Sequence, residues 1–154
     1  MERETACRTS YLYRDAIWRM VCSSVMPTKF LGDAHPALQS AWLRLLDIYN
    51  RDHSGYTLII TCVHRSEEEQ ALLYAQGRTK PGNKVTQIDG VTKKSNHNYY
   101  PSRALDFAVS IYGKVSWSPV DYEPVGAIAK ECGLVWGGKW SFRDYCHLEL
   151  PKDE

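Results

Sequence analysis

The sequence lacks the features that would place it in a special class of proteins. It has only 10 glycines and 7 prolines in 154 residues, and 24% of its residues are charged against 44% that are hydrophobic. That balance excludes collagen-like and coiled-coil arrays and disfavours disorder. Since domains commonly run to roughly 100–200 residues, we expect one ordinary globular domain with at most a small appendage.

An excess of charge of one sign is also missing. The 19 Lys and Arg residues nearly balance the 18 Asp and Glu residues, which leaves a net charge of +1. This is too little to hold a polyphosphate or an acidic membrane by bulk charge, so we expect no nucleic-acid partner. The charge is nevertheless uneven, because residues 78–94 carry five cations against Asp89, a local charge of +4. This stretch is either a solvated loop or a rim that attracts a substrate rich in carboxylates.

Paired cysteines and long hydrophobic runs are absent as well. The five cysteines form an odd set without a C-x-x-C pair, which argues against a disulfide-stapled secreted domain and favours a reducing compartment during synthesis. The apolar stretch at residues 16–26 is short and interrupted by Arg19, so it fits neither a signal peptide nor a membrane span. The sequence therefore predicts no integral membrane segment and a protein that is cytoplasmic on synthesis.

Helix and strand signals follow one another irregularly along the chain. Apolar residues at helical spacing predict helices, and β-branched or alternating runs predict strands. The expected helices span about 11–25, 36–49, 66–77 and 122–132, and the expected strands span 57–63, 104–109 and 146–150. The turn signals in residues 78–94 favour a hairpin. This order predicts an α+β fold with a small sheet, in which residues 1–30 form a helical extension and residues 31–154 the main domain.

Three segments carry side chains suited to catalysis. Strand alternation places Asp106 on a face of small residues, where a ligand has room, and His147 shares a face with Glu149. With His97, these residues offer two imidazoles and a carboxylate, which would form a zinc site with three protein ligands and an open fourth position. Such side chains are also common as capped polar groups, so their spacing alone leaves both interpretations open.

Residues 61–149 resemble the zinc peptidases that include D-alanyl-D-alanine carboxypeptidases, vancomycin-resistance dipeptidases and the L-alanyl-D-glutamate endolysins of bacteriophages. The matching pieces occur in the family's order: His64-Arg65-Ser66 with Gln70, Leu73 to Thr79, Ser95 to Tyr99, Ala104 to Phe107, Gly133 to Trp140, and Asp144 to Glu149. The pieces Gln-Gly-Arg-Thr and Trp-Gly-Gly-Lys-Trp are similar to the L-alanyl-D-glutamate branch in particular. The resemblance implies a metallopeptidase fold with a small antiparallel sheet flanked by helices.

The resemblance also implies roles for individual residues. It makes His97, Asp106 and His147 the ligands of one zinc ion and Asp144 the general base. Arg65 takes the place of the arginine that supports the reacting carbonyl. Such an arrangement can hydrolyse an amide, since it supplies an activated water, a base and a cation for the oxyanion.

Four further residues are candidates for substrate binding, each beside a structural alternative. The candidates are Gln70, Ser95, Arg78 and Trp136. Gln70 and Ser95 would bind the substrate backbone or orient Arg65, and their structural alternatives are a helix-surface contact and a local turn. The alternatives for Arg78 and Trp136 are a solvated loop and core packing. Glu149 either holds a ligand imidazole by its second nitrogen or faces solvent.

The spacing between two proposed ligands departs from the family pattern. Asp106 is nine residues after His97, where the family usually has seven, and residues 100–103 fill the space. We expect this two-residue insertion to reshape one wall of the site.

The function that the resemblance implies is a zinc-dependent peptidoglycan peptidase of the endolysin type. It would cut the L-alanyl-D-glutamate bond of murein stem peptides, act as a monomer, and reach the wall through a membrane lesion made by a holin. Residues 31–154 would then be the catalytic domain. Two alternatives stay open: a D-alanyl-D-alanine carboxypeptidase or dipeptidase on the same fold, and a non-catalytic zinc-stabilised binding domain, since fold does not fix function.

Overall fold

The computed structural model describes residues 27–152. The helix predicted over residues 11–25 lies outside the described residues, so the extension proposed for residues 1–30 stays a prediction. The helices are α2 (Pro36–Asp52), α3 (Glu67–Ala75) and α4 (Glu123–Glu131), and the strands are β1 (Tyr56–Cys62), β2 (Ala104–Ile111), β3 (Lys114–Ser116), β4 (Val135–Trp136) and β5 (His147–Glu149). The predicted α+β class with a small sheet is confirmed.

The sheet is antiparallel, and β2 lies at its centre. The strand order is β1-β2-β5-β4, and β3 forms a further pair with β2. The register places Asp106 of β2 opposite Cys62 of β1 on one side and opposite His147 of β5 on the other. Residues directly opposite in a sheet present their side chains on the same face. The topology thus brings two of the three predicted ligands together.

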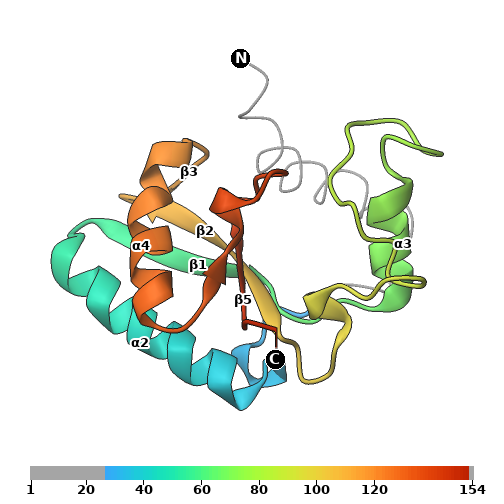
Figure 1. Cartoon of the computed structure of the whole chain (residues 1–154). Helices are drawn as coiled ribbons and strands as arrows, with labels where there is room; N and C mark the ends of the chain where they lie inside the picture. The colour runs from blue at the N-terminus through green and yellow to red at the C-terminus, as the bar shows by residue number, and fades with distance from the viewer. Residues whose placement is uncertain (1–26, 153–154) are drawn as a thin grey trace.

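The hydrophobic core lies between the sheet and two helices on one of its faces. Leu105, Phe107 and Val109 of β2 are fully buried in a cluster with residues of α2 and α4. The alternation predicted for this strand is confirmed, because these side chains face the core while Asp106 faces the other way. Figure 1 shows α2 and α4 beside each other against the sheet, with α3 at the other end of the molecule.

Helix α3 begins with the predicted capping box. Ser66 Oγ accepts from the Glu69 N–H at 3.2 Å, and the Glu69 carboxylate accepts from the Ser66 N–H at 2.7 Å. These two bonds satisfy N–H groups that have no partner within the helix.

Among the described residues, no helix has the length and apolar character needed to cross a bilayer.

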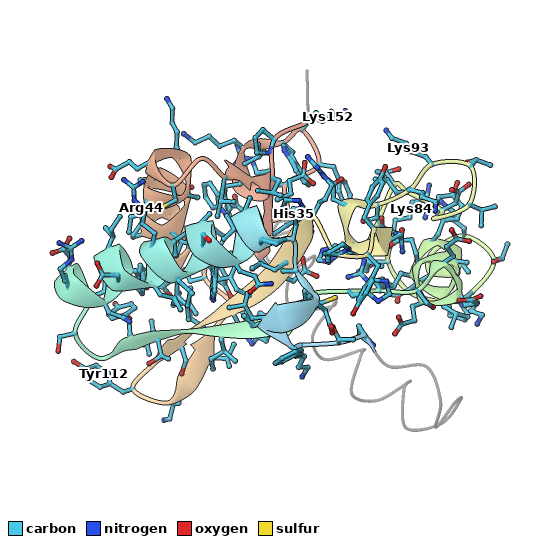
Figure 2. The ribbon with its side chains drawn as sticks, turned by 90° about the horizontal axis from the view of Figure 1, so that it is seen from below. His35, Arg44, Lys84, Lys93, Tyr112 and Lys152 are labelled. Carbon is cyan, nitrogen blue, oxygen red and sulfur yellow. The ribbon has the colours of Figure 1, made fainter. Side chains whose placement is uncertain are left out.

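The segment after α3 differs from the hairpin that its turn signals favour. Residues 78–94 contain turns and bends but no strand. Asp89 holds one of the turns, since its Oδ1 accepts from the backbone N–H groups of Val91, Thr92 and Lys93 at 3.0–3.1 Å. A side chain that accepts these donors replaces the ladder that a hairpin would need. Figure 2 shows Lys84 and Lys93 projecting at this end of the molecule, far from Tyr112.

Candidate metal centre

Three donor atoms converge beside the central strand pair, on the face opposite the hydrophobic core. His97 Nε2 and His147 Nδ1 each lie 3.1 Å from Asp106 Oδ1, and the two nitrogens lie 3.3 Å from each other. Ligands of a tetrahedral zinc ion at 2.0–2.2 Å lie about 3.3 Å apart. The residues therefore fit a zinc ion by both the chemistry and the spacing of their donors.

The second nitrogen of each imidazole contacts an acceptor. His97 Nδ1 lies 2.7 Å from the carbonyl oxygen of Val63, and His147 Nε2 lies 3.0 Å from Glu149 Oε2. A carbonyl or a carboxylate can only accept, so each outer nitrogen carries a proton. The inner nitrogens face Asp106 Oδ1 and would bind the metal after losing any proton shared with that carboxylate.

Cys62 is a second potential donor beside the same residues. Its thiol, with His97 and Asp106, offers donor atoms that all lie within 4.8 Å of one another. The sulfur, however, is 3.8 Å from Nδ1 of His97, the nitrogen that already donates to Val63. The geometry therefore favours His147 as the third donor. Burial opposes ionisation of Cys62, but the Arg65 guanidinium and His97 together lower its pKa to about 7.

Arg65 lies against the carboxylate at the centre of the site. One guanidinium nitrogen donates to Asp106 Oδ2 at 3.1 Å, and another donates to Gln70 Oε1 at 2.8 Å. Burial raises the pKa of Asp106, but His97, His147 and Arg65 outweigh burial and hold that pKa well below its usual range. Asp106 thus stays a carboxylate, as a ligand must be.

Asp144 lines the same pocket as the donor set, and its surroundings favour the protonated form of its carboxyl group. Burial raises the pKa of its carboxyl group, and the negative charge of Asp106 raises it further. A base is most effective when its pKa lies near the working pH. The backbone holds Asp144 in place, since its N–H donates to the carbonyl of Gly137 at 3.0 Å. A Cβ on Gly137 would lie 2.6 Å from the Asp144 carbonyl oxygen, so this close approach requires glycine.

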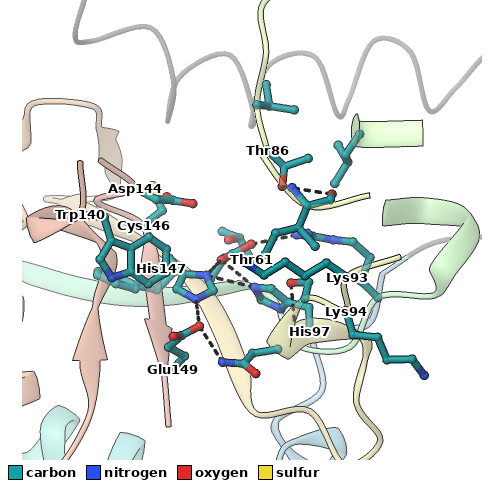
Figure 3. A pocket seen from close by; sticks show the side chains of 18 of the residues that line it. Thr61, Thr86, Lys93, Lys94, His97, Trp140, Asp144, Cys146, His147 and Glu149 are labelled. Atoms are coloured by element: carbon teal, nitrogen blue, oxygen red, sulfur yellow. Dashed lines mark hydrogen bonds and ion pairs between the residues drawn. The ribbon is translucent and has the colours of Figure 1, made fainter. Parts of the chain in front are cut away.

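The three donor residues, Arg65 and Asp144 all line one pocket of about 420 Å³, and its two sides differ. Figure 3 shows Trp140 and Asp144 on one side of the imidazole pair, and Thr86, Lys93 and Lys94 on the other. The Trp140 ring lies over His147, with 5.0 Å between the ring centroids. The pocket is large enough for a small ligand or a short peptide segment.

Comparisons with known proteins point to one family. Residues 89–150 match the peptidase M15 family described as D-alanyl-D-alanine carboxypeptidase. The chain is 41% identical over 109 residues to the peptidoglycan L-alanyl-D-glutamate endopeptidase CwlK of Bacillus subtilis (strain 168), a match that covers 64% of this chain and 63% of that protein. The chain is similar to peptidase M15 proteins over these residues. It spans less than two thirds of the length of that relative.

A solved structure shares the fold of this chain. The crystal structure of the Serratia marcescens L-Ala D-Glu endopeptidase ChiX matches with a TM-score of 0.58 and 21% sequence identity. The match covers 83% of this chain and 92% of that one. It supports the arrangement of sheet and helices described above.

The structure places the four candidate substrate-binding residues differently. Ser95 lines the described pocket, and its Oγ also accepts from the His97 N–H. Gln70 is fully buried beside Arg65, where its Nε2 donates to Thr86 and to the Ile88 carbonyl. It therefore fits the alternative of orienting Arg65 rather than direct contact with substrate.

Arg78 and Trp136 are not among the residues that line this pocket. Arg78 lies 3.8 Å from the Tyr74 ring centroid and donates to the carbonyls of Tyr74 and Thr86. Trp136 belongs to the core and donates to the Tyr145 carbonyl at 2.9 Å. Arg78 thus anchors its loop and Trp136 packs in the core, and substrate contacts of both residues stay predictions.

The insertion before Asp106 also lies away from the described pocket. Ser102 is buried and donates to the carbonyl oxygens of Val63 and Ala104, and Tyr100 packs edge-on against His64. None of residues 99–103 lines the described pocket. These residues pack toward residues 33–35 and 63–64, and the reshaping of a wall stays a prediction.

Sequence reasoning did not single out two residues of the site. Asn96 precedes a ligand and lines the pocket, and its side chain donates to Glu149 at 2.8 Å. Thr86 forms part of the wall from within an irregular loop. The position of Asn96 next to His97 was a usable signal, but the position of Thr86 follows from Gln70 contacts that no local pattern encodes.

Proposed function

We propose that this protein is a zinc-dependent peptidoglycan endopeptidase that hydrolyses the L-alanyl-D-glutamate bond of murein stem peptides. The observation that carries the proposal is the triangle of His97, Asp106 and His147 donor atoms, flanked by a carboxylate and a guanidinium in one pocket. The similarity to CwlK supports the choice of bond.

Each residue of the site has a task in amide hydrolysis. Zinc held by His97, Asp106 and His147 would supply Lewis acidity, which lowers the pKa of water toward about 7. Asp144 would accept a proton from the attacking water and pass it to the leaving amine. Arg65, fixed by Asp106 and Gln70, would stabilise the negative charge that develops on the carbonyl oxygen.

The charge of the pocket rim suits an anionic peptide. Lys93 and Lys94 both line the pocket, and Lys94 is paired with Glu67 at 3.1 Å. Murein stem peptides carry several carboxylates. Lys93 would therefore attract the substrate, and this attraction should weaken as salt screens it.

The test is to identify the new termini that the enzyme produces. We would incubate the purified zinc-loaded protein with peptidoglycan and analyse the products by mass spectrometry. A new D-glutamate amino terminus is the expected result. Asp144→Ala protein serves as the control for contaminating hydrolases. Absence of any product, with zinc bound, would contradict the proposed activity and support a zinc-stabilised binding domain.

A second candidate function is D-alanyl-D-alanine carboxypeptidase activity. The description of the matching family favours it, and the same donor set would serve either bond. The same experiment distinguishes the two, because this activity releases free D-alanine. The monomeric state, holin-dependent release and a role in phage lysis stay predictions.

A further inference from the structure

Glu149 lies behind one of the proposed metal ligands. Its Oε2 accepts from His147 Nε2 at 3.0 Å and from Asn96 Nδ2 at 2.8 Å. Asn96 begins the 3-10 turn Asn96–Asn98 that carries His97, whereas His147 and Glu149 belong to β5. One carboxylate oxygen thus joins two ligand-bearing segments that are 50 residues apart in sequence.

The carboxylate fixes the orientation of the His147 ring. Glu149 accepts from Nε2 and so holds the ring with Nδ1 toward Asp106 and His97. An imidazole that binds a metal through Nδ1 keeps its proton on Nε2, where Glu149 can accept it. Without this acceptor, the ring would be free to turn Nδ1 away from the direction in which the metal must bind.

Asn96 keeps the carboxylate in place. Its backbone is fixed, since its carbonyl accepts from the Arg103 N–H at 2.9 Å, and its side chain reaches Glu149 from that fixed point. Glu149 stands opposite the fully buried Ala104 in the β2–β5 register, and only 17% of its side chain is exposed. A partly buried carboxylate with two donors on one oxygen has little freedom to rotate.

We propose that Glu149 is a positioning residue for His147, and that Asn96 acts on the metal site only through Glu149. The inference rests on the proposed metal site. It concerns the affinity for zinc and is independent of which peptide bond is cut.

The experiment measures zinc affinity of the purified full chain by competition with a chelator, without substrate. Glu149→Leu should bind zinc about 10–100-fold more weakly than the unmodified chain, the usual cost of losing such a partner. Glu149→Gln and Asn96→Ala should each show a smaller loss, because each keeps part of the contact. The matched control is Glu131→Leu, an exposed position at the end of α4, which should bind as the unmodified chain does.

A double variant tests the order of action. If Asn96 acts only through Glu149, Asn96→Ala combined with Glu149→Leu should bind zinc no more weakly than Glu149→Leu alone. NMR of the zinc-loaded chain should show the His147 Nε2–H protected from exchange with water, and Glu149→Leu should remove that protection. A purely structural role would lower the melting temperature of the metal-free protein without this change.

The outcomes separate the proposals. Unchanged zinc affinity in Glu149→Leu, or fully additive losses in the double variant, would overturn the positioning role. If Glu149→Leu does not fold, the zinc affinities of Glu149→Gln and Asn96→Ala provide the test. Unchanged affinity in both variants would equally overturn the positioning role of Glu149. Failure of the unmodified chain to bind zinc would instead overturn the metal site on which the proposed function depends.

Discussion

Asp106 is the residue on which the geometry of the site depends. Its Oδ1 faces both imidazoles, and its Oδ2 faces Arg65. The two oxygens thereby connect the donor set to the proposed oxyanion-stabilising cation through a single carboxylate. A change in the position of this side chain would displace metal and arginine together, so both tasks depend on the β2 register.

Asp144→Ala should separate metal binding from catalysis. Asp144 is not one of the three converging donors, so the variant should keep its zinc. Loss of a general base commonly costs about 10²–10⁴-fold in rate, and we expect hydrolysis to fall by that order. Zinc content measured by atomic emission, together with kcat on a stem peptide, checks both points. A variant that stays active would show that Asp144 is not the base.

Two buried tyrosines should respond oppositely to removal of their hydroxyl groups. Tyr122 donates to the Ser116 carbonyl at 2.9 Å, whereas the Tyr49 hydroxyl is buried without a hydrogen-bond partner among the described residues. Tyr122→Phe should therefore lower the free energy of unfolding by about 1 kcal/mol, and Tyr49→Phe should leave it unchanged or raise it by up to about 1 kcal/mol. Urea unfolding at pH 7 measures both, and destabilisation by Tyr49→Phe would contradict the assignment.

The same tyrosines predict a loss of stability in alkali. Burial, the largest cause, raises the pKa of each hydroxyl from 10.0 to about 12. The folded state therefore retains these protons to a higher pH than the unfolded state does. Their contribution to the free energy of unfolding is full below pH 10 and is lost as the pH rises to about 12. Between pH 10 and about 12, the free energy of unfolding should therefore fall less steeply in each single Phe variant than in the unmodified chain.

At the scale of elements, the sequence predicts what periodicity or capping encodes. The stripe beginning at Pro36 and the Ser66–Glu69 capping box correspond to α2 and α3, and α4 falls within the predicted 122–132. Strands β3 and β4 are only three and two residues long, too short for an alternating pattern. Residues 78–94 carry turn signals whose outcome depends on hydrogen bonds to Asp89, which the pattern does not fix.

The contact between α4 and β4 requires a glycine. A Cβ on Gly126 would lie 2.0 Å from the Trp136 ring, and that ring is held in the core by its bond to Tyr145. Gly126→Ala should therefore destabilise the protein by about 1–3 kcal/mol through overpacking, despite a gain of about 1 kcal/mol in helix propensity. Thermal unfolding measures the change.

A neighbouring position separates the two contributions to that change. Ala127 is exposed in the same helix, so Ala127→Gly reports helix propensity alone, at a cost of about 1 kcal/mol. If Gly126→Ala instead stabilises the protein by a similar amount, the close packing of Trp136 against α4 is wrong.

At the scale of the whole molecule, the metal site connects parts of the chain that the sequence keeps apart. His97 lies on the turn after the α3 region, Asp106 on the central strand and His147 on β5. The resemblance of the sequence to a family predicts all three ligands, but periodicity alone gives only the strand faces of Asp106 and His147. The contacts of His97 with Val63 and of Glu149 with Asn96 span more than 30 residues and follow from the tertiary fold.

Because its ligands come from three distant segments, zinc should stabilise the entire domain. A ligand that binds only the folded state adds RT ln(1 + [L]/Kd), about 4 kcal/mol at a free concentration 1,000 times Kd. A chelator should therefore lower the melting temperature of the unmodified chain, and added zinc should restore it. His97→Ala lacks one of three donors, so its melting temperature should respond little to either treatment. An equal chelator effect in both proteins would place the stabilising metal elsewhere in the chain, because the His97 site could not then be its origin.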